Sequence, residues 1–225
     1  MTTTDTSTHR GPTLTAVVRE VKGPRPILSR VGEANLTRRQ REVLDQLLAV
    51  FADGFAHLTM ADIAAEVRCS LRTLYELAPS RDDLVLLVVD RHMWKVGRTA
   101  VEGVSANSSA LDGIRAYLRG ANEAVAHTSE SFAEDTFADP RTRELMQSHS
   151  QYLIDVTRAL LDDAVAREEI MPVNTAAAAR VLAGLGADLS QPGVIGSLNA
   201  SPKDASNELV DIIIAGLEYP HRPND

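Results

Sequence analysis

The sequence predicts an all-α protein in which a group of short helices precedes a larger helical bundle. Aromatic residues make up only 4% of the 225 residues, whereas Ala, Leu and Val are plentiful, and this composition favours packed helices over a β-sandwich or barrel. From residue 37 onward, apolar residues recur at the i, i+3, i+4, i+7 spacing of amphipathic helices. Residues that typically cap or end helices stand at the boundaries of these segments.

The overall composition is that of a globular protein, with 44% hydrophobic and 24% charged residues. No stretch approaches the ~18 consecutive apolar residues of a membrane span, and the polar N-terminus lacks the apolar core of a secretory signal. The single Cys cannot form an internal disulfide. We therefore expect a cytoplasmic protein that has no membrane partner. The sequence shows neither a glycine-rich phosphate loop nor a cluster with metal-ligand spacing, so we expect no cofactor and no metal.

The net charge of −8 is unevenly distributed along the chain. Residues 1–41 hold eight Lys or Arg and only three Asp or Glu, and residues 1–81 hold eleven basic against nine acidic residues. The acidic excess therefore belongs to the remainder of the chain. A nucleic acid responds to the charge of the surface that it meets, so an acidic total does not exclude a DNA-binding N-terminal part.

Residues 1–36 are rich in Thr, Ser, Pro, Gly and Arg and show no sustained helical period. This composition predicts a flexible basic N-terminal arm. The stretch "VKGPRPILSR" is compatible with an arm that lies in a minor groove, but a solvated tail is the favoured interpretation.

The first expected helix covers about residues 38–53. "TRRQ", which begins at Thr37, is a capping-box pattern, and Gly54 is placed to end the helix in the left-handed conformation. Between them, one apolar stripe has helical spacing. Its members are Leu44, Leu47, Leu48 and Phe51.

A helix-turn-helix is expected next. A second capping box opens a helix at Thr59, and Ser70 caps a short helix over 71–77 after a turn at 67–70. Pro79 ends that helix because the residue before a proline is disfavoured in helical geometry. We expect Leu71, Leu74 and Tyr75 on its inner side. Together these helices predict a compact domain over residues 37–81.

Residues 82–225 are expected to form a second, entirely helical domain. The patterns predict helices at about 82–102, 109–127, 140–169, 174–188 and 203–217. The stretch "SFAEDTFADP" interrupts this pattern, and we expect it to form a broken connection between two of the helices.

Residues 41–84 resemble the DNA-binding domain of the TetR family of bacterial transcriptional regulators. Five motifs occur in the expected order: "FADGF" with its Gly one position early, "TMADIA", a turn ending in "RCS", "LRTLY" and "SRDDL". Such elements in order and at the right separations are much more specific than any one of them. The resemblance implies a helix-turn-helix domain followed by a helical bundle that binds an effector and dimerises.

The sequence departs from the family pattern in its details. Arg68 stands where the family usually has Gly in the turn, so the backbone there must be regular or strained. Leu77 and Ala78 replace a His-Phe pair whose His commonly touches a phosphate. Arg81 replaces a Lys, which keeps the charge and adds a bidentate option.

The short helix over 71–77 carries the expected base contacts. Arg72 can reach guanine edges, Thr73 a thymine methyl or phosphate, and Glu76 a cytosine amine. Tyr75, and Arg81 at a helix N-terminus, are expected on phosphates. Without DNA binding, these residues would simply be solvated, or for Tyr75 part of the core. The expected DNA-binding residues are Thr59, Ser70, Arg72, Thr73, Tyr75, Glu76 and Arg81.

One such helix reaches only one half-site, so we expect a homodimer on a palindromic operator. The last two helices are the candidate interface, as the resemblance implies, although their apolar faces could instead pack internally. The expected interface residues are Val181, Leu185, Leu209, Ile212, Ile213 and Leu217.

A small-molecule site is expected among the helices of the second domain, since helical bundles place such sites in their core. For each candidate taken alone, an ordinary core residue is the favoured interpretation. The candidate pocket residues are Trp94, Tyr117, His127, Phe132, Phe137, Met146, His149 and Tyr152.

The sequence thus predicts a DNA-binding transcriptional regulator, specifically a repressor that a small-molecule effector releases from its operator. The alternative is a dimeric helical interaction protein with a degenerate helix-turn-helix. An enzyme is disfavoured because His127, His149, Glu134 and Asp135 have the spacing of no nucleophile-base pair or metal set.

Overall fold

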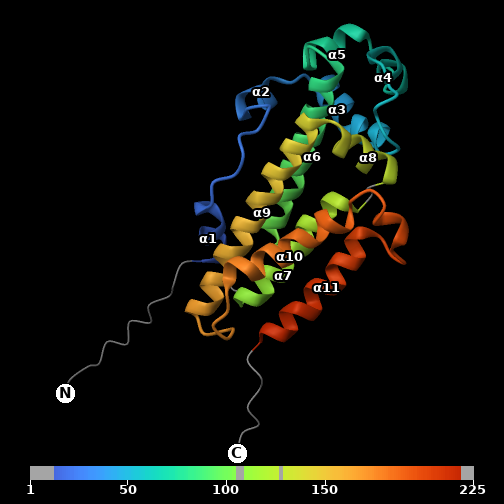
Figure 1. Ribbon diagram of the computed structural model, residues 1–225. Coiled ribbons are helices and arrows are strands. Elements are labelled where there is room, and N and C mark those ends of the chain that lie inside the picture. The colour runs from blue at the N-terminus through green and yellow to red at the C-terminus, as the bar shows by residue number, and fades with distance from the viewer. Residues whose placement is uncertain (1–12, 105–108, 127–128, 219–225) are drawn as a thin grey trace, which may run out of the picture.

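The computed structural model describes residues 13–104, 109–126 and 129–218, and the regular elements within these ranges are all helices. Three helices form a head at one end of the molecule, and five further helices form a body below it (Figure 1). None of the described helices is long and apolar enough to cross a membrane. The expected all-α architecture, with a helix-turn-helix head followed by a helical bundle, is confirmed.

The head consists of α3 (Arg38–Phe51), α4 (Met60–Glu66) and α5 (Leu71–Leu77). Both expected capping boxes are present, at the start of α3 and at the start of α4, and the Ser70 hydroxyl caps α5. The apolar stripes of the three helices meet the first half of α6 (Arg81–Glu102) in one core. Its fully buried members include Leu47, Phe51, Ile63, Leu74 and Leu84.

Two positions of α5 differ from the expectation. Leu71 and Tyr75, which we expected on the inner side, are 44% and 55% exposed. Leu74 is the only buried residue of this seven-residue helix, so a single side chain makes its main contact with the core. A helix of this length has one narrow inner face, which Leu74 occupies. Leu71 and Tyr75 therefore lie at the edge of this face, where solvent reaches them.

The turn between α4 and α5 contains Arg68 in the left-handed region, with φ at 49°. Glycine adopts this conformation without strain, whereas a residue with a Cβ in this conformation lowers the stability of the fold by about 1–2 kcal/mol. Nη2 of Arg39 donates to the carbonyl oxygens of Val67 and Arg68 at 3.0 and 2.8 Å. The guanidinium of α3 thus holds the strained turn in place.

The body contains α6, α7 (Ala110–Asn122), α9 (Pro140–Ala166), α10 (Thr175–Leu189) and α11 (Pro202–Leu217), with the short η1 (Glu123–Val125) and η2 (Ile195–Ser197) in its connections. The predicted helix over 109–127 therefore ends earlier, at Asn122. Helices α6 and α9 are the longest, and they run from the head down the length of the body (Figure 1). The body core is separate from that of the head and includes Ile114, Leu160, Leu161 and Ile214.

The expected broken connection at "SFAEDTFADP" is wrong, because most of it forms α8 (Glu130–Ala138). The Ser129 hydroxyl accepts from the Phe132 N–H and so starts the helix. The break falls only at Asp139, whose carboxylate caps α9, with Pro140 at its first position. The Asp139-Pro140 pair thus marks a boundary between two helices rather than between a loop and a helix.

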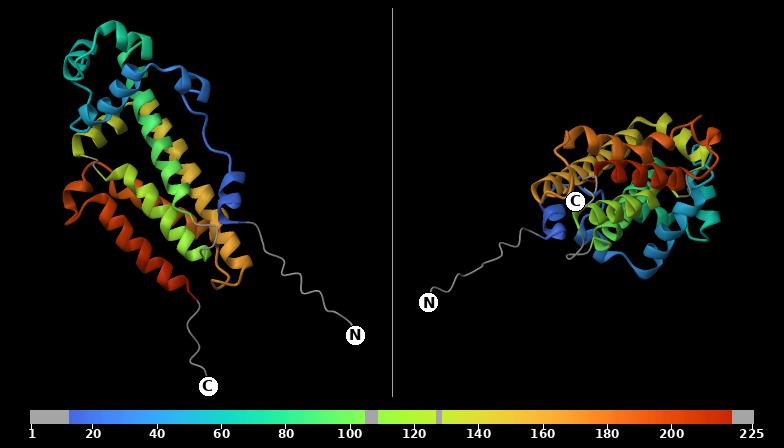
Figure 2. Two further views of the ribbon diagram at one scale, coloured as in Figure 1. Left: turned by 180° about the vertical axis from the view of Figure 1, so that it is seen from behind. Right: turned by 90° about the horizontal axis from the view of Figure 1, so that it is seen from below.

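Residues 13–36 form a strap along one side of the molecule, and for this part the expected flexible arm is wrong (Figures 1 and 2). Helix α1 (Leu14–Glu20) buries Leu14 and Val18 in the body core, and α2 (Arg30–Asn35) lies beside the head. The apolar positions of α1 do have helical spacing, but seven residues are too few for a period to stand out in a Pro- and Gly-rich segment. Residues 1–12 of the expected arm lie outside the described residues.

Candidate nucleic-acid interface and effector cavity

Helix α5 presents a polar face to solvent. The Arg72 side chain is 88% exposed and the Glu76 side chain 49% exposed, and the two form an ion pair of 2.9 Å along the helix. Exposed pairs of this kind stabilise a helix little, so either side chain is free to exchange its partner for a base edge or a phosphate. Thr73 is half-buried beside them, and its hydroxyl lies 2.9 Å from that of Ser70. The structure therefore brings Ser70, Arg72, Thr73 and Glu76 together on one element.

Thr59 is already engaged with its own helix. Its hydroxyl and its backbone N–H both bond to the carboxylate of Asp62, at 2.6 and 2.9 Å. These hydrogen bonds from Thr59 lower the pKa of Asp62. A negative charge thus occupies the N-terminus of α4, where we expected a phosphate contact.

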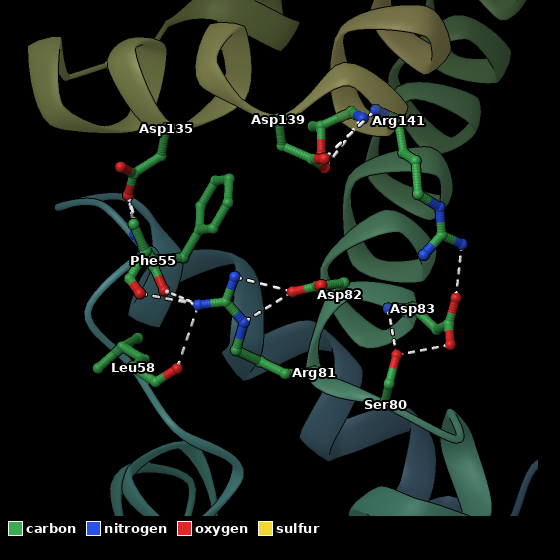
Figure 3. A network of polar contacts seen from close by, with 11 residues as sticks. Phe55, Leu58, Ser80, Arg81, Asp82, Asp83, Asp135, Asp139 and Arg141 are labelled. Carbon is green, nitrogen blue, oxygen red and sulfur yellow. Dashed lines mark hydrogen bonds and ion pairs between the residues drawn. The ribbon is translucent and has the colours of Figure 1, made fainter.

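The structure gives Arg81 contacts within the chain that the sequence did not predict. Its Nη1 donates to the carbonyl oxygens of Phe55, Ala56 and Leu58 at 3.2, 2.8 and 3.4 Å, and its other nitrogens pair with Asp82 (Figure 3). These carbonyls belong to the loop between α3 and α4. Arg81 therefore ties this loop to the start of α6.

Helix α8 holds the same loop from the opposite side. Oδ2 of Asp135 accepts from the N–H groups of Phe55 and Ala56 at 2.5 and 2.7 Å (Figure 3). The Ser129 hydroxyl donates to the carbonyl oxygen of Ala52 at 2.5 Å. Gly54 between them has φ at 97°, and a Cβ there would lie 3.1 Å from Oδ2 of Asp135. The expected left-handed Gly54 thus also lets α8 approach the loop closely.

Sequence reasoning missed a basic group beside the turn. Arg38 is 93% exposed at the start of α3, Arg39 reaches the turn, and Arg68 is exposed within it. The basic excess of residues 1–41 was the available signal. Its link to the α4–α5 turn depends on tertiary packing, which a local pattern does not contain.

A cavity of about 480 Å³ lies in the body between α6, α7, α8, α9 and α10. It has the size of small-molecule sites in proteins, about 300–1,000 Å³. One expected pocket residue, His127, lies outside the described residues. The others all line the cavity, and these are Trp94, Tyr117, Phe132, Phe137, Met146, His149 and Tyr152.

A buried polar pair lies at one wall of this cavity. Asp90, which is 2% exposed, accepts from Nε2 of His149 at 2.9 Å and from the backbone N–H of Ile27 at 2.8 Å. Ile27 belongs to the strap. A single carboxylate on α6 thus joins a cavity residue of α9 to the N-terminal segment, and neither contact has a signature in the sequence.

The expected interface residues divide into two groups. Val181, Leu209 and Ile212 are 55%, 37% and 61% exposed on α10 and α11. Leu185, Ile213 and Leu217 are partly buried and pack against the body core, which is the internal alternative for these three. Of the six expected interface residues, only Val181, Leu209 and Ile212 therefore form an exposed apolar surface on α10 and α11.

No family model matches the sequence, and no curated protein matches it. Solved structures do match. A TetR transcription regulator from Haloarcula marismortui aligns with a TM-score of 0.64 at 11% identity, covering 82% of this chain and all of its own. A TetR-like transcriptional regulator from Rhodococcus sp. RHA1 gives 0.57 at 22% identity, with coverages of 81% and 100%.

A third similar structure is AibR, solved in complex with isovaleryl coenzyme A and operator DNA. It gives a TM-score of 0.57 at 16% identity and covers 78% of this chain and 97% of its own. The fold of the chain is therefore the TetR-like fold.

Proposed function

We propose that this chain is a sequence-specific DNA-binding transcriptional regulator. The observation that carries this proposal is the exposed polar face of α5, with Arg72, Thr73 and Glu76 fixed by the Ser70 cap and the buried Leu74. A helix of seven residues does not hold itself together in water, so its attachment to the head is what makes it a rigid reading element. Residues 37–81 would then be the DNA-binding domain and 82–225 the effector-binding and dimerisation domain.

The dimer belongs to the same proposal. Two copies of α5 reach successive major-groove faces of a palindromic operator only if the chains pair with twofold symmetry. The exposed Val181, Leu209 and Ile212 on α10 and α11 would lie at that interface. Ile212→Glu should shift the mass measured by sedimentation from dimer to monomer, whereas Val31→Glu, at an even more exposed apolar position on α2, should leave it unchanged.

Effector control is proposed to act through α8 as well as α6. One side of α8 lines the cavity with Phe132, Thr136 and Phe137, while Asp135 on the same helix holds the α3–α4 loop. A molecule that favours a different position of α8 would therefore change how the head sits on the body. A saturating ligand would lower operator affinity by the ratio of its own affinities for the DNA-free and the DNA-bound arrangement of head and body. The chain would then act as a repressor that its effector releases from the operator.

The experiment that tests the function is selection of bound duplexes from a random DNA library by the purified protein. An enriched palindrome supports a dimeric operator-binding regulator. Recovery of an unenriched library indicates the alternative, a helical interaction protein whose helix-turn-helix no longer reads DNA. For the effector, isovaleryl coenzyme A, the ligand named for AibR, is a first compound to test against the operator complex.

The control by α8 has its own test. Asp135→Asn weakens the hold on the α3–α4 loop without altering the cavity lining, so the ligand should still bind but should change operator affinity less than in the parent protein. Glu134→Gln, the neighbouring residue on α8, provides the matched control.

A further inference from the structure

The cavity contains polar groups that have no partner. Within the described residues, the indole Nε1 of Trp94 and the hydroxyl of Thr136 are buried without a hydrogen bond. The hydroxyl of Tyr117 also lacks a hydrogen-bond partner in the described part of the chain, although this residue is only 2% exposed. All three residues line the cavity, from α6, α8 and α7 respectively.

These three groups are neutral hydrogen-bond donors. Burial, and the neighbouring Tyr152, raise the pKa of Tyr117 well above its usual value, so its phenol keeps its proton. A buried donor without an acceptor lowers stability by about 1–3 kcal/mol. A ligand that brings acceptor oxygens to these donors would remove that loss, and this favours its binding.

The charged groups of the lining lie only at its exposed edge. Arg143, Arg180 and Asp188 are all exposed, and Arg143 already donates to the carbonyl oxygen of Phe137. Apart from these three, His149 is the remaining acidic or basic side chain among the described lining residues besides the two tyrosines, and its Nε2 is committed to Asp90. A ligand carboxylate or phosphate in the interior would therefore be buried without an opposite charge, and close to the Asp90 carboxylate.

We propose that the part of the effector that enters this cavity is uncharged, mainly apolar, and carries carbonyl or ether oxygens that accept from Tyr117, Thr136 and Trp94. This inference rests on the proposed function and names the chemistry of its effector site. Any anionic part of the effector would remain outside, near Arg143 and Arg180. The match is to an ester-like or ketone-like molecule rather than to a free acid, whose charge would be buried without a partner, or to an ammonium, which has no acceptor to offer these donors.

The chain offers a built-in reporter for the test. Trp94 is its only Trp, so intrinsic tryptophan fluorescence follows the cavity alone. The full-length protein is titrated with methyl octanoate, octanoate and octylamine, which share one chain and differ in charge. The ester should bind at least ~10-fold more tightly than either ion, since an unpaired charge is strongly disfavoured in an apolar site. Equal or tighter binding of octanoate or octylamine, or no saturable response to the ester, overturns the proposal.

Two variants separate a ligand contact from a structural role. Tyr117→Phe and Thr136→Val each remove an unpartnered hydroxyl, so the free protein should melt at the same or a higher temperature. The same variants should weaken binding of the ester about 3- to 10-fold. Thr99→Val, on the exposed side of α6, is the matched control and should leave ester binding unchanged. Loss of stability without loss of ester affinity contradicts the assigned contacts.

Failure of this inference is distinguishable from failure of the proposed function. The order of ester, acid and amine is measured without DNA, whereas the regulator proposal depends on enrichment of a DNA sequence. A protein that selects an operator but prefers octanoate would keep the proposed function and reject the inferred ligand chemistry.

Discussion

Nη1 of Arg81 lies 2.8 Å from the carbonyl oxygen of Ala56 and within 3.4 Å of two further carbonyls in the α3–α4 loop. A guanidinium at the start of α6 thus fixes a loop that Asp135 of α8 holds from the other side. The loop belongs to the head and is bonded to both α6 and α8, so its position depends on both of these helices.

Arg81→Ala should therefore act mainly on stability. Removing the side chain leaves carbonyls of the loop without a charged donor, and we expect a loss of about 1–3 kcal/mol in the free energy of unfolding by urea. Arg81→Lys should recover part of this loss, because an ammonium can reach one carbonyl but not three. Unchanged stability together with weakened DNA binding would restore the phosphate role expected from the sequence.

Arg68→Gly should stabilise the protein or leave it unchanged. Glycine removes the strain of the left-handed backbone, which should raise the free energy of unfolding by about 1–2 kcal/mol. Glycine also increases the conformational entropy of the unfolded chain, and this offsets about 0.5–1 kcal/mol of the gain. The measurement is the midpoint of urea-induced unfolding, compared between proteins whose unfolding free energy depends equally steeply on urea concentration. Cys69→Gly is the control: Cys69 is not in the left-handed region, so this change should destabilise the protein. If Arg68→Gly also destabilised the protein, the proposed strain at Arg68 would be contradicted.

Leu14→Ala should destabilise the protein by about 2–5 kcal/mol, the usual cost of truncating a fully buried Leu. Leu14 packs closely over Gly113, where an added Cβ would lie 2.6 Å from its Cδ1. Val31→Ala on α2, 70% exposed, is the control and should change stability by less than about 0.5 kcal/mol. Equal effects of the two changes on the thermal midpoint would show that the strap does not pack on the body.

The acid side of the stability profile should depend on Asp139. A hydrogen bond from the Thr142 hydroxyl is the main cause that lowers the pKa of Asp139, and backbone N–H groups of α9 add to it. A carboxyl whose pKa is lower in the folded than in the unfolded state stabilises the protein at pH values above its unfolded-state pKa, here 3.8. This stability is lost as the pH falls from 3.8 through the lower pKa of the folded state.

Asp139→Asn keeps a capping side chain but does not titrate. Its unfolding midpoint, measured from pH 6 to pH 2, should therefore fall less steeply below pH 4 than that of the parent protein. Parallel curves for the two proteins would exclude this contribution.

Local patterns predicted those parts of the fold that local chemistry specifies. The capping boxes at Thr37 and Thr59, the Ser70 cap and the left-handed Gly54 are each set by a few adjacent residues, and all are present. The described aromatic candidates also line the cavity, as expected for large side chains on the inner faces of bundle helices, although Phe137 is 39% exposed.

The remaining features depend on contacts between distant residues. Asp90 meets Ile27 and His149, and Asp135 meets Phe55, over separations of 59 to 80 residues. Helices α1 and α8 were missed since short segments gain their stability from packing rather than from their own propensity. The same dependence gives Arg81 hydrogen bonds to the backbone of the loop that the sequence did not predict.

The central claim is that the exposed face of α5 reads DNA, and binding of purified protein to two duplexes tests it most directly. The affinities for a library-selected palindrome and for its scrambled counterpart are measured from low to moderate salt. We predict a preference of at least ~10³-fold for the palindrome, affinity that falls steeply with salt, and a much smaller preference for Arg72→Ala. Equal affinity for both duplexes at every salt concentration would contradict the account.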